Sequence, residues 1–168
     1  MQEAHFHRSI NKKQIIIGLV SLLIGSMVYL IDRPPDQTYF VYKNPLSITF
    51  YNSVPKLFGI IGNSLPAFLH VFSFILITAG FFCCRKAGYV IICLTWFCID
   101  SGFELGQKYG HATIQMIPDW FEGIPFLENT KTYFLHGAFD IIDLVAIAFG
   151  SLTAYFVISV TGKRIKIS

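Results

Sequence analysis

Long apolar runs alternate with short polar segments along this chain. Three of these runs contain no Asp, Glu, Lys or Arg: residues 14–31, 57–84 and 144–162. An α-helix rises about 1.5 Å per residue, so about 20 apolar residues cross the roughly 30 Å of hydrocarbon in a bilayer. Each run is therefore long enough to supply one membrane-spanning helix.

A fourth apolar stretch, residues 87–99, has only 13 residues. It crosses the membrane only if its helix continues through Asp100 and Glu104 to Gln107. We therefore predict an all-α membrane protein that forms a single domain over residues 1–168. The four transmembrane helices are expected at residues 14–31, 65–84, 88–107 and 139–160.

The composition agrees with a membrane protein. Mean hydropathy is +0.57, and 54% of the residues are hydrophobic. Only 14% are charged, against roughly 25% in a typical soluble domain. The lipid bilayer is accordingly the first expected partner of this chain.

Basic residues gather on one side of the four-helix arrangement. The two chain ends and the 83–88 turn hold 8 of the 13 Lys and Arg residues and a single acid, Glu3. The remaining segments hold 5 basic and 9 acidic residues. By the positive-inside rule both termini are expected in the cytoplasm, with two longer exoplasmic loops at 32–64 and 108–136. The net charge of +3 is thus divided between two membrane faces, and it gives no indication of nucleic acid binding.

Two polar stripes at helical spacing interrupt the apolar pattern. The stripe in the third predicted helix consists of Asp100, Glu104 and Gln107. The stripe at the start of the fourth helix consists of His136, Asp140 and Asp143. Residues separated by three or four positions share one helix face, so each stripe places its polar groups together. Ionisable groups at membrane depth are costly and usually functional.

A histidine on the second predicted helix lies at a matching depth. His70 is about 8 Å in from the outer end of that helix, at 1.5 Å per residue. We expect it to join both stripes in one outward-facing pocket that binds a cation, a cationic group or a lipid headgroup; an outer vestibule open to water is the alternative. The two histidines are the only nearby groups in this scheme that can become cationic, and they cannot balance four carboxylates. A divalent cation is one expected occupant, with His70, Glu104 and Asp143 as the candidate metal ligands.

Small residues mark candidate helix-packing surfaces. Gly102, Gly106 and Gly110 form a doubled G-x-x-x-G motif on the third helix, roughly opposite its acidic stripe. Such a motif lets another helix approach closely. We expect that helix to be either the first span of this chain or a helix of a partner membrane subunit. Gly150 is a further helix-packing candidate, on the stripe of the fourth helix.

The order of these motifs resembles a known family. His70 closes the segment Pro66-Ala-Phe-Leu-His, Glu104 opens an E-x-x-Q motif, and Asp143 is followed after seven residues by Gly150. In this order residues 60–156 resemble the VanZ-like integral membrane proteins, in which a His, an E-x-x-Q and a D-x-x-x-N-x-x-G lie on successive helices. Ile147 stands at the Asn position, and no Arg lies between the E-x-x-Q and the last helix, where the family often has one.

The resemblance implies a small envelope protein of a bacterial inner membrane, in a family associated with teicoplanin-type glycopeptide resistance. Three functions follow as hypotheses: a polar pocket that binds a cationic group, an accessory subunit of a larger membrane complex, or a metal-assisted hydrolase or transferase acting on an outer-leaflet lipid. The chain contains no H-E-x-x-H and no G-x-S-x-G motif, so no residue is assigned a catalytic role.

The predicted orientation can be tested by labelling. A cysteine introduced within residues 36–44 is expected to react with a membrane-impermeant maleimide on intact cells, whereas a cysteine replacing Ser168 is expected to react only after permeabilisation. The parent chain, with its four native cysteines, is the control. The opposite labelling pattern would reverse the orientation and move the polar pocket to the cytoplasmic side.

Overall fold

Four long helices dominate the fold. The structure is a computed structural model, and it describes residues 10–35, 49–82, 86–124 and 127–162. The long helices are α1 (Lys12–Asp32), α2 (Leu65–Phe82), α3 (Lys86–Lys108) and α6 (Ile141–Thr161). Each is long and apolar enough to cross a membrane, which confirms the prediction of four such helices in an all-helical, multi-pass chain.

Short helical pieces connect the long ones. They are η2 (Ile61–Asn63), α4 (Gly110–Gln115), η3 (Asp119–Gly123) and α5 (Thr130–His136). Both chain termini, residues 36–48 and residues 83–85 of the expected cytoplasmic turn lie outside the described residues. The orientation predicted from the basic residues of the chain ends therefore remains a prediction.

Local sequence explains where the long helices begin and end. Asn11 caps α1, because its side chain accepts a hydrogen bond from the Gln14 backbone N–H at 3.5 Å. The same helix ends just before Pro34 and Pro35, which disfavour helical geometry in the residue that precedes them. Pro66 is tolerated in the first turn of α2, where a backbone N–H has no helical partner to lose.

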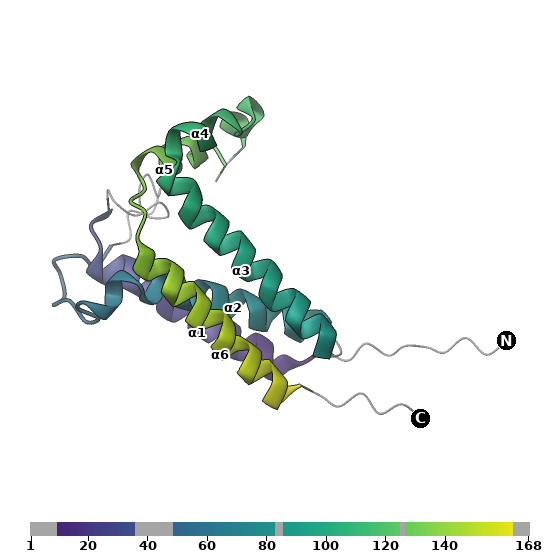
Figure 1. Cartoon of the computed structure of the whole chain (residues 1–168). Coiled ribbons are helices and arrows are strands. Elements are labelled where there is room, and N and C mark those ends of the chain that lie inside the picture. Colours follow the sequence, from purple (N-terminus) through teal and green to yellow (C-terminus); the bar gives the residue numbers. More distant parts are fainter. Residues whose placement is uncertain (1–9, 36–48, 83–85, 125–126, 163–168) are drawn as a thin grey trace, which may run out of the picture.

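The long helices lie side by side, with the start of α1 and the end of α6 at the same end of the bundle (Figure 1). At this end the Asn11 amide donates a hydrogen bond to the Thr161 carbonyl at 2.9 Å. α4 and α5 lie at the opposite end, beyond the last turn of α3 (Figure 1). We call this opposite end the α5 end; it is where α1 and α3 finish and where α2 and α6 begin.

The buried core runs along α2. Val71, Ile75 and Ala79 pack with residues of α6 such as Ile158, and Tyr89 and Cys93 of α3 complete the cluster. Most other large apolar side chains of the long helices point outward. This inside-out distribution suits a chain whose solvent is lipid, where helices associate through close packing rather than through burial from water.

Gly18 and Gly150 allow two other helices to approach α2 closely. A Cβ atom on Gly18 of α1 would lie 2.7 Å from Ile77 and 2.8 Å from the Ser73 carbonyl of α2. Gly150 of α6 lies equally close to Val71 and Phe68 of α2. The central helix α2 is therefore held between two small-residue contacts, and Gly150 lies in a helix–helix interface.

The glycine face of α3 differs from what we expected. α3 ends at Lys108, so Gly110 is the first residue of α4 and not part of the same helix as Gly102 and Gly106. A Cβ on Gly106 would lie 2.6 Å from the Phe134 ring of α5, and Gly110 lies against the Phe134 carbonyl. Gly102 has no atom within 4 Å of such a Cβ. Neither the first span nor a partner subunit is needed to cover Gly106 and Gly110, because α5 of the same chain packs there. The G-x-x-x-G pattern predicts close packing but does not identify the packing partner.

Substitution of these glycines should separate packed from open positions. Gly150→Ala is expected to lower stability by about 1–3 kcal/mol, because the new methyl group would lie 2.6 Å from Val71 and 2.7 Å from the Phe68 carbonyl. Gly102→Ala, in open space, is the matched control and should leave stability unchanged or slightly raised. Thermal unfolding in detergent measures both, and equal melting temperatures for the two variants would contradict the packing described for α2 and α6.

Candidate functional site

A histidine–carboxylate pair joins α2 to α3. His70 Nδ1 lies 3.0 Å from Asp100 Oδ2. The Asp100 side chain is 7% exposed, whereas the His70 side chain is 46% exposed. A buried carboxylate is costly unless it is paired and hydrogen-bonded, so His70 is the group that makes Asp100 tolerable inside α3.

Aromatic rings fix the position of this pair. The Phe74 ring lies 4.5 Å from the His70 imidazole and 4.6 Å from the Trp96 ring, between centroids. The Trp96 indole N–H in turn donates to the Thr78 hydroxyl at 3.0 Å. This ladder spans from α2 to α3 and limits rotation of the imidazole.

Glu104 supports the start of α6 from a neighbouring helix. Asp140 is the N-cap of α6, and its carboxylate accepts a hydrogen bond from the Ile142 N–H at 2.8 Å. In a capping box, the side chain three residues later would accept the N–H of the capping residue itself. Here Glu104 Oε1 of α3 accepts the Asp140 N–H instead, at 2.8 Å. The 8% exposed Glu104 thus fastens α3 to the first turn of α6.

Asp143 is three residues after the N-cap, where a capping box would use its side chain to accept the Asp140 N–H. Glu104 accepts that N–H instead. The Oδ1 atom of Asp143 is buried without a hydrogen-bond partner among the described residues. Ser64 hydrogen-bonds to the side chain, and Asp140 and Glu104 interact with Asp143 electrostatically. A carboxylate in the first turn is favoured by the helix dipole, yet a buried oxygen with no donor requires an explanation.

One cation at this site was missed by the sequence analysis. Arg33, the C-cap of α1, interacts electrostatically with Asp143. Its guanidinium lies 4.8 Å from the centre of the Tyr29 ring and donates to the Asn63 carbonyl at 2.6 Å. The expectation that two histidines are the only nearby cationic groups is therefore wrong. Arg33 follows the first apolar run, so it lies at the level where α2 and α6 begin, and this matching depth is the signal that could have identified it.

The other two predicted site residues have different surroundings. The Gln107 amide donates to the Tyr133 hydroxyl of α5. Burial raises the pKa of Tyr133 to about 12, so this phenol keeps its proton at neutral pH. His136 is exposed at the last position of α5, and it forms no hydrogen bond or ion pair with the residues that the structure describes. The structure therefore brings Gln107 into contact with α5 and leaves His136 at the surface.

The candidate metal ligands are engaged separately. His70 pairs with Asp100, and Glu104 accepts the Asp140 N–H. Across the described ranges, no three His, Cys, Asp or Glu side chains converge as a metal site would require. The geometry therefore does not support His70, Glu104 and Asp143 as a coordination set.

A lysine and two carboxylates connect the loops at the α5 end. The Lys131 ammonium donates to Asp119 at 2.9 Å and to Glu122 at 2.8 Å. These bonds raise the pKa of Lys131, with Glu122 the larger cause, and the Lys131 ammonium lowers the pKa of the Asp119 carboxyl. All three groups lie at the surface, where such pairs contribute little to stability. These hydrogen bonds nevertheless connect η3 to α5, the helix that carries Tyr133.

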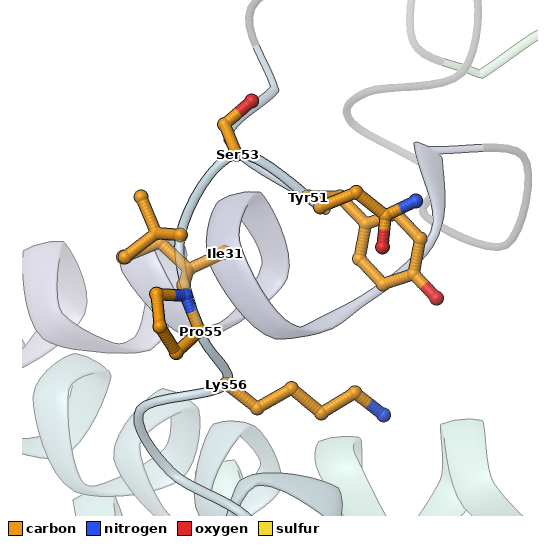
Figure 2. Close-up of a pocket in the computed structure, with 7 residues that line it drawn as sticks. Ile31, Tyr51, Ser53, Pro55 and Lys56 are labelled. Carbon is orange, nitrogen blue, oxygen red and sulfur yellow. The ribbon is translucent and has the colours of Figure 1, made fainter.

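Asp32, the last residue of α1, anchors the first loop. Its two carboxylate oxygens accept hydrogen bonds from the Leu57 N–H at 3.0 Å and the Phe58 N–H at 2.9 Å. Beside it lies an open hollow, in which Tyr51 and Lys56 of the loop face the end of α1 (Figure 2). The hollow contains none of the predicted site carboxylates, so it is a feature of the loop rather than of the polar site.

Comparison with known proteins does not assign this chain to a family. No protein-family model, no curated protein and no solved structure matches it.

The capping role of Asp140 leads to a stability prediction. Asp140→Ala removes the acceptor for the Ile142 N–H and should lower stability by about 1 kcal/mol. Asp140→Asn keeps an acceptor oxygen and should be close to the parent. Thermal unfolding of both variants in detergent is the measurement, and an Asn variant as unstable as the Ala variant would show that charge at Asp140, rather than capping, supports α6.

Proposed function

We propose that this chain is a multi-pass membrane protein that binds a cationic group, of the kind carried by an amine headgroup, at the α5 end of its bundle. The observation that carries the proposal is the gathering of Glu104, Asp140 and Asp143 around the first turn of α6. These carboxylates come from two helices, so the cluster exists only in the folded chain. Its location at the end of the four candidate spans supports a site at the level of lipid headgroups.

The charge balance favours a cationic ligand. At an effective dielectric of ~20, two like charges 4 Å apart repel by about 4 kcal/mol. Arg33 can balance one of the three carboxylates, while His70 is engaged with Asp100. The remaining negative charge requires protons, water or a bound cation.

A primary ammonium fits this arrangement best. It supplies three N–H donors as well as a positive charge. Asp143 Oδ1 is a buried acceptor without a donor among the described residues, so it offers a bond that an ammonium can complete. A divalent metal is less well supported, because the described histidine and carboxylates do not converge into a coordination set.

Membership of the VanZ-like family, with both termini in the cytoplasm of a bacterial cell, is part of this proposal. The family often has an Arg between the E-x-x-Q and the last helix, and this chain has none there. Arg33 at the end of α1 supports the proposal because it supplies a guanidinium that interacts with Asp143. In the predicted orientation the α5 end faces the exterior. The accessory-subunit alternative gains no specific support, because α5 already covers Gly106 and Gly110. The metal-assisted lipid hydrolase gains none either, because no three potential metal ligands converge among the described residues.

The proposal can be tested with a matched pair of amphiphiles. Dodecylammonium added to the detergent is expected to raise the melting temperature of the parent chain more than dodecanol, which has the same alkyl chain without the charge. Glu104→Gln should lose most of this difference while remaining folded, because its amide oxygen still accepts the Asp140 N–H. Glu128→Gln, at an exposed loop position, is the control and should respond like the parent.

Two outcomes would count against the proposal. Equal effects of dodecylammonium and dodecanol on the parent would remove the evidence for a cation site. An unchanged response in Glu104→Gln would place any such site elsewhere. Stabilisation by calcium that a chelator reverses, without stabilisation by dodecylammonium, would favour a metal instead of an amine.

A further inference from the structure

The His70 imidazole has one nitrogen that the protein leaves unused. Nδ1 faces Asp100 at 3.0 Å, and the side chain is 46% exposed. Within the described ranges the imidazole makes no other hydrogen bond, so Nε2 is available at the protein surface. Because His70 lies in the second turn of a membrane-spanning helix, lipid is the surrounding medium that must satisfy this nitrogen.

Depth decides which part of a lipid His70 can reach. It is five residues after Leu65, which places its Cα about 8 Å along α2 from the α5 end. Side chains on a helix lean toward its N-terminus, and the N-terminus of α2 is at the α5 end. The imidazole is therefore directed toward the membrane surface, where glycerol esters and phosphates lie.

Charge decides which lipid group fits. Asp100 is a buried carboxylate that faces Nδ1, and a positive charge on the imidazole would compensate it. In that form Nε2–H would be a donor directed away from Asp100. The strongest acceptor in the headgroup region is a phosphate oxygen, which forms charge-assisted hydrogen bonds with such donors.

We propose that His70 binds the phosphate of a phospholipid whose amine occupies the Glu104–Asp143 cluster, so that the ligand is a phospholipid with a primary amine headgroup. This inference rests on the proposed function for the amine end. Asp100 and Glu104 are one helical turn apart on α3, with Cβ atoms about 5–6 Å apart. His70 is thus attached, through Asp100, to the turn of α3 that adjoins Glu104. A phosphoethanolamine headgroup is short, with two carbons between the phosphate oxygen and the nitrogen, and it is the headgroup that we propose for neighbouring phosphate and amine positions.

The aromatic ladder extends the site toward the bilayer centre. Phe74 and Trp96 stack in sequence beyond His70, and both are only partly buried. They offer an apolar wall for the first carbons of an acyl chain. In this proposal the amine of one lipid meets the acidic cluster and its phosphate meets His70. The first carbons of its acyl chain then meet Phe74 and Trp96.

The experiment compares four lipids on the full chain by native mass spectrometry from detergent: phosphatidylethanolamine, phosphatidylcholine, phosphatidylglycerol and diacylglycerol. Phosphatidylethanolamine is expected to bind best and diacylglycerol, which lacks the phosphate, worst. His70→Gln should weaken all three phospholipids about tenfold while leaving diacylglycerol unchanged, since a charged hydrogen bond is lost. Glu104→Gln should instead remove only the preference for phosphatidylethanolamine over phosphatidylglycerol.

Controls separate a lost contact from a lost fold. His111→Gln, at an exposed position of α4, should bind like the parent. Asp100→Asn keeps the imidazole but removes its counter-charge, so it should weaken phospholipid binding as His70→Gln does. His70→Gln and Asp100→Asn both break the His70–Asp100 pair, so their melting temperatures are expected to fall below that of the parent; a retained cooperative unfolding transition establishes that they are folded.

The inference and the proposed function can fail independently. If dodecylammonium stabilises the chain but phosphatidylethanolamine binds no better than diacylglycerol, the phosphate site is wrong and the amine site stands. Undiminished phospholipid binding by His70→Gln would also overturn the inference. If phosphatidylglycerol binds as well as phosphatidylethanolamine while dodecylammonium has no effect, the amine site is wrong and His70 alone holds the lipid.

Discussion

The cost of placing carboxylates in apolar helices shapes one end of this molecule. Two buried acids of α3 are each met by a group from another part of the chain: Asp100 by His70 of α2, and Glu104 by the backbone N–H of Asp140, the N-cap of α6. Arg33 brings the end of α1 into the electrostatic surroundings of Asp143. The same contacts that make the acids tolerable therefore connect all four long helices at the α5 end, so the charge cluster and the fold depend on each other.

The opposite end is held together differently. There the amide of Gln14 donates to the Thr161 hydroxyl at 3.0 Å, and Gly80 of α2 lies against Ile15 of α1. These contacts are neutral, so they need no counter-charge. In the acidic cluster of the described residues, three carboxylates outnumber the one cation that interacts with them, Arg33, which is why we locate the binding function there.

The sequence predicts the helices well because run length and charge are local properties. The continuation of α3 through Asp100 and Glu104 to Lys108 followed from the simple need to span the bilayer. The packing of Phe134 on Gly106 could not be read in the same way, because it depends on how a distant segment folds back at the α5 end. The pairing of Glu104 with a backbone N–H was equally hidden, since spacing identifies a polar face and not its partner. Helix existence was thus predictable, whereas the partners of each acid required the tertiary structure.

An experimental density map of the chain in nanodiscs that contain phosphatidylethanolamine tests the central claim most directly. The account predicts headgroup density at the α5 end, with its nitrogen within about 3 Å of a carboxylate oxygen of Glu104 or Asp143. Its phosphate should lie beside His70. A map in which Arg33 and ordered water satisfy Asp143, with acyl chains alone against His70, would contradict the account.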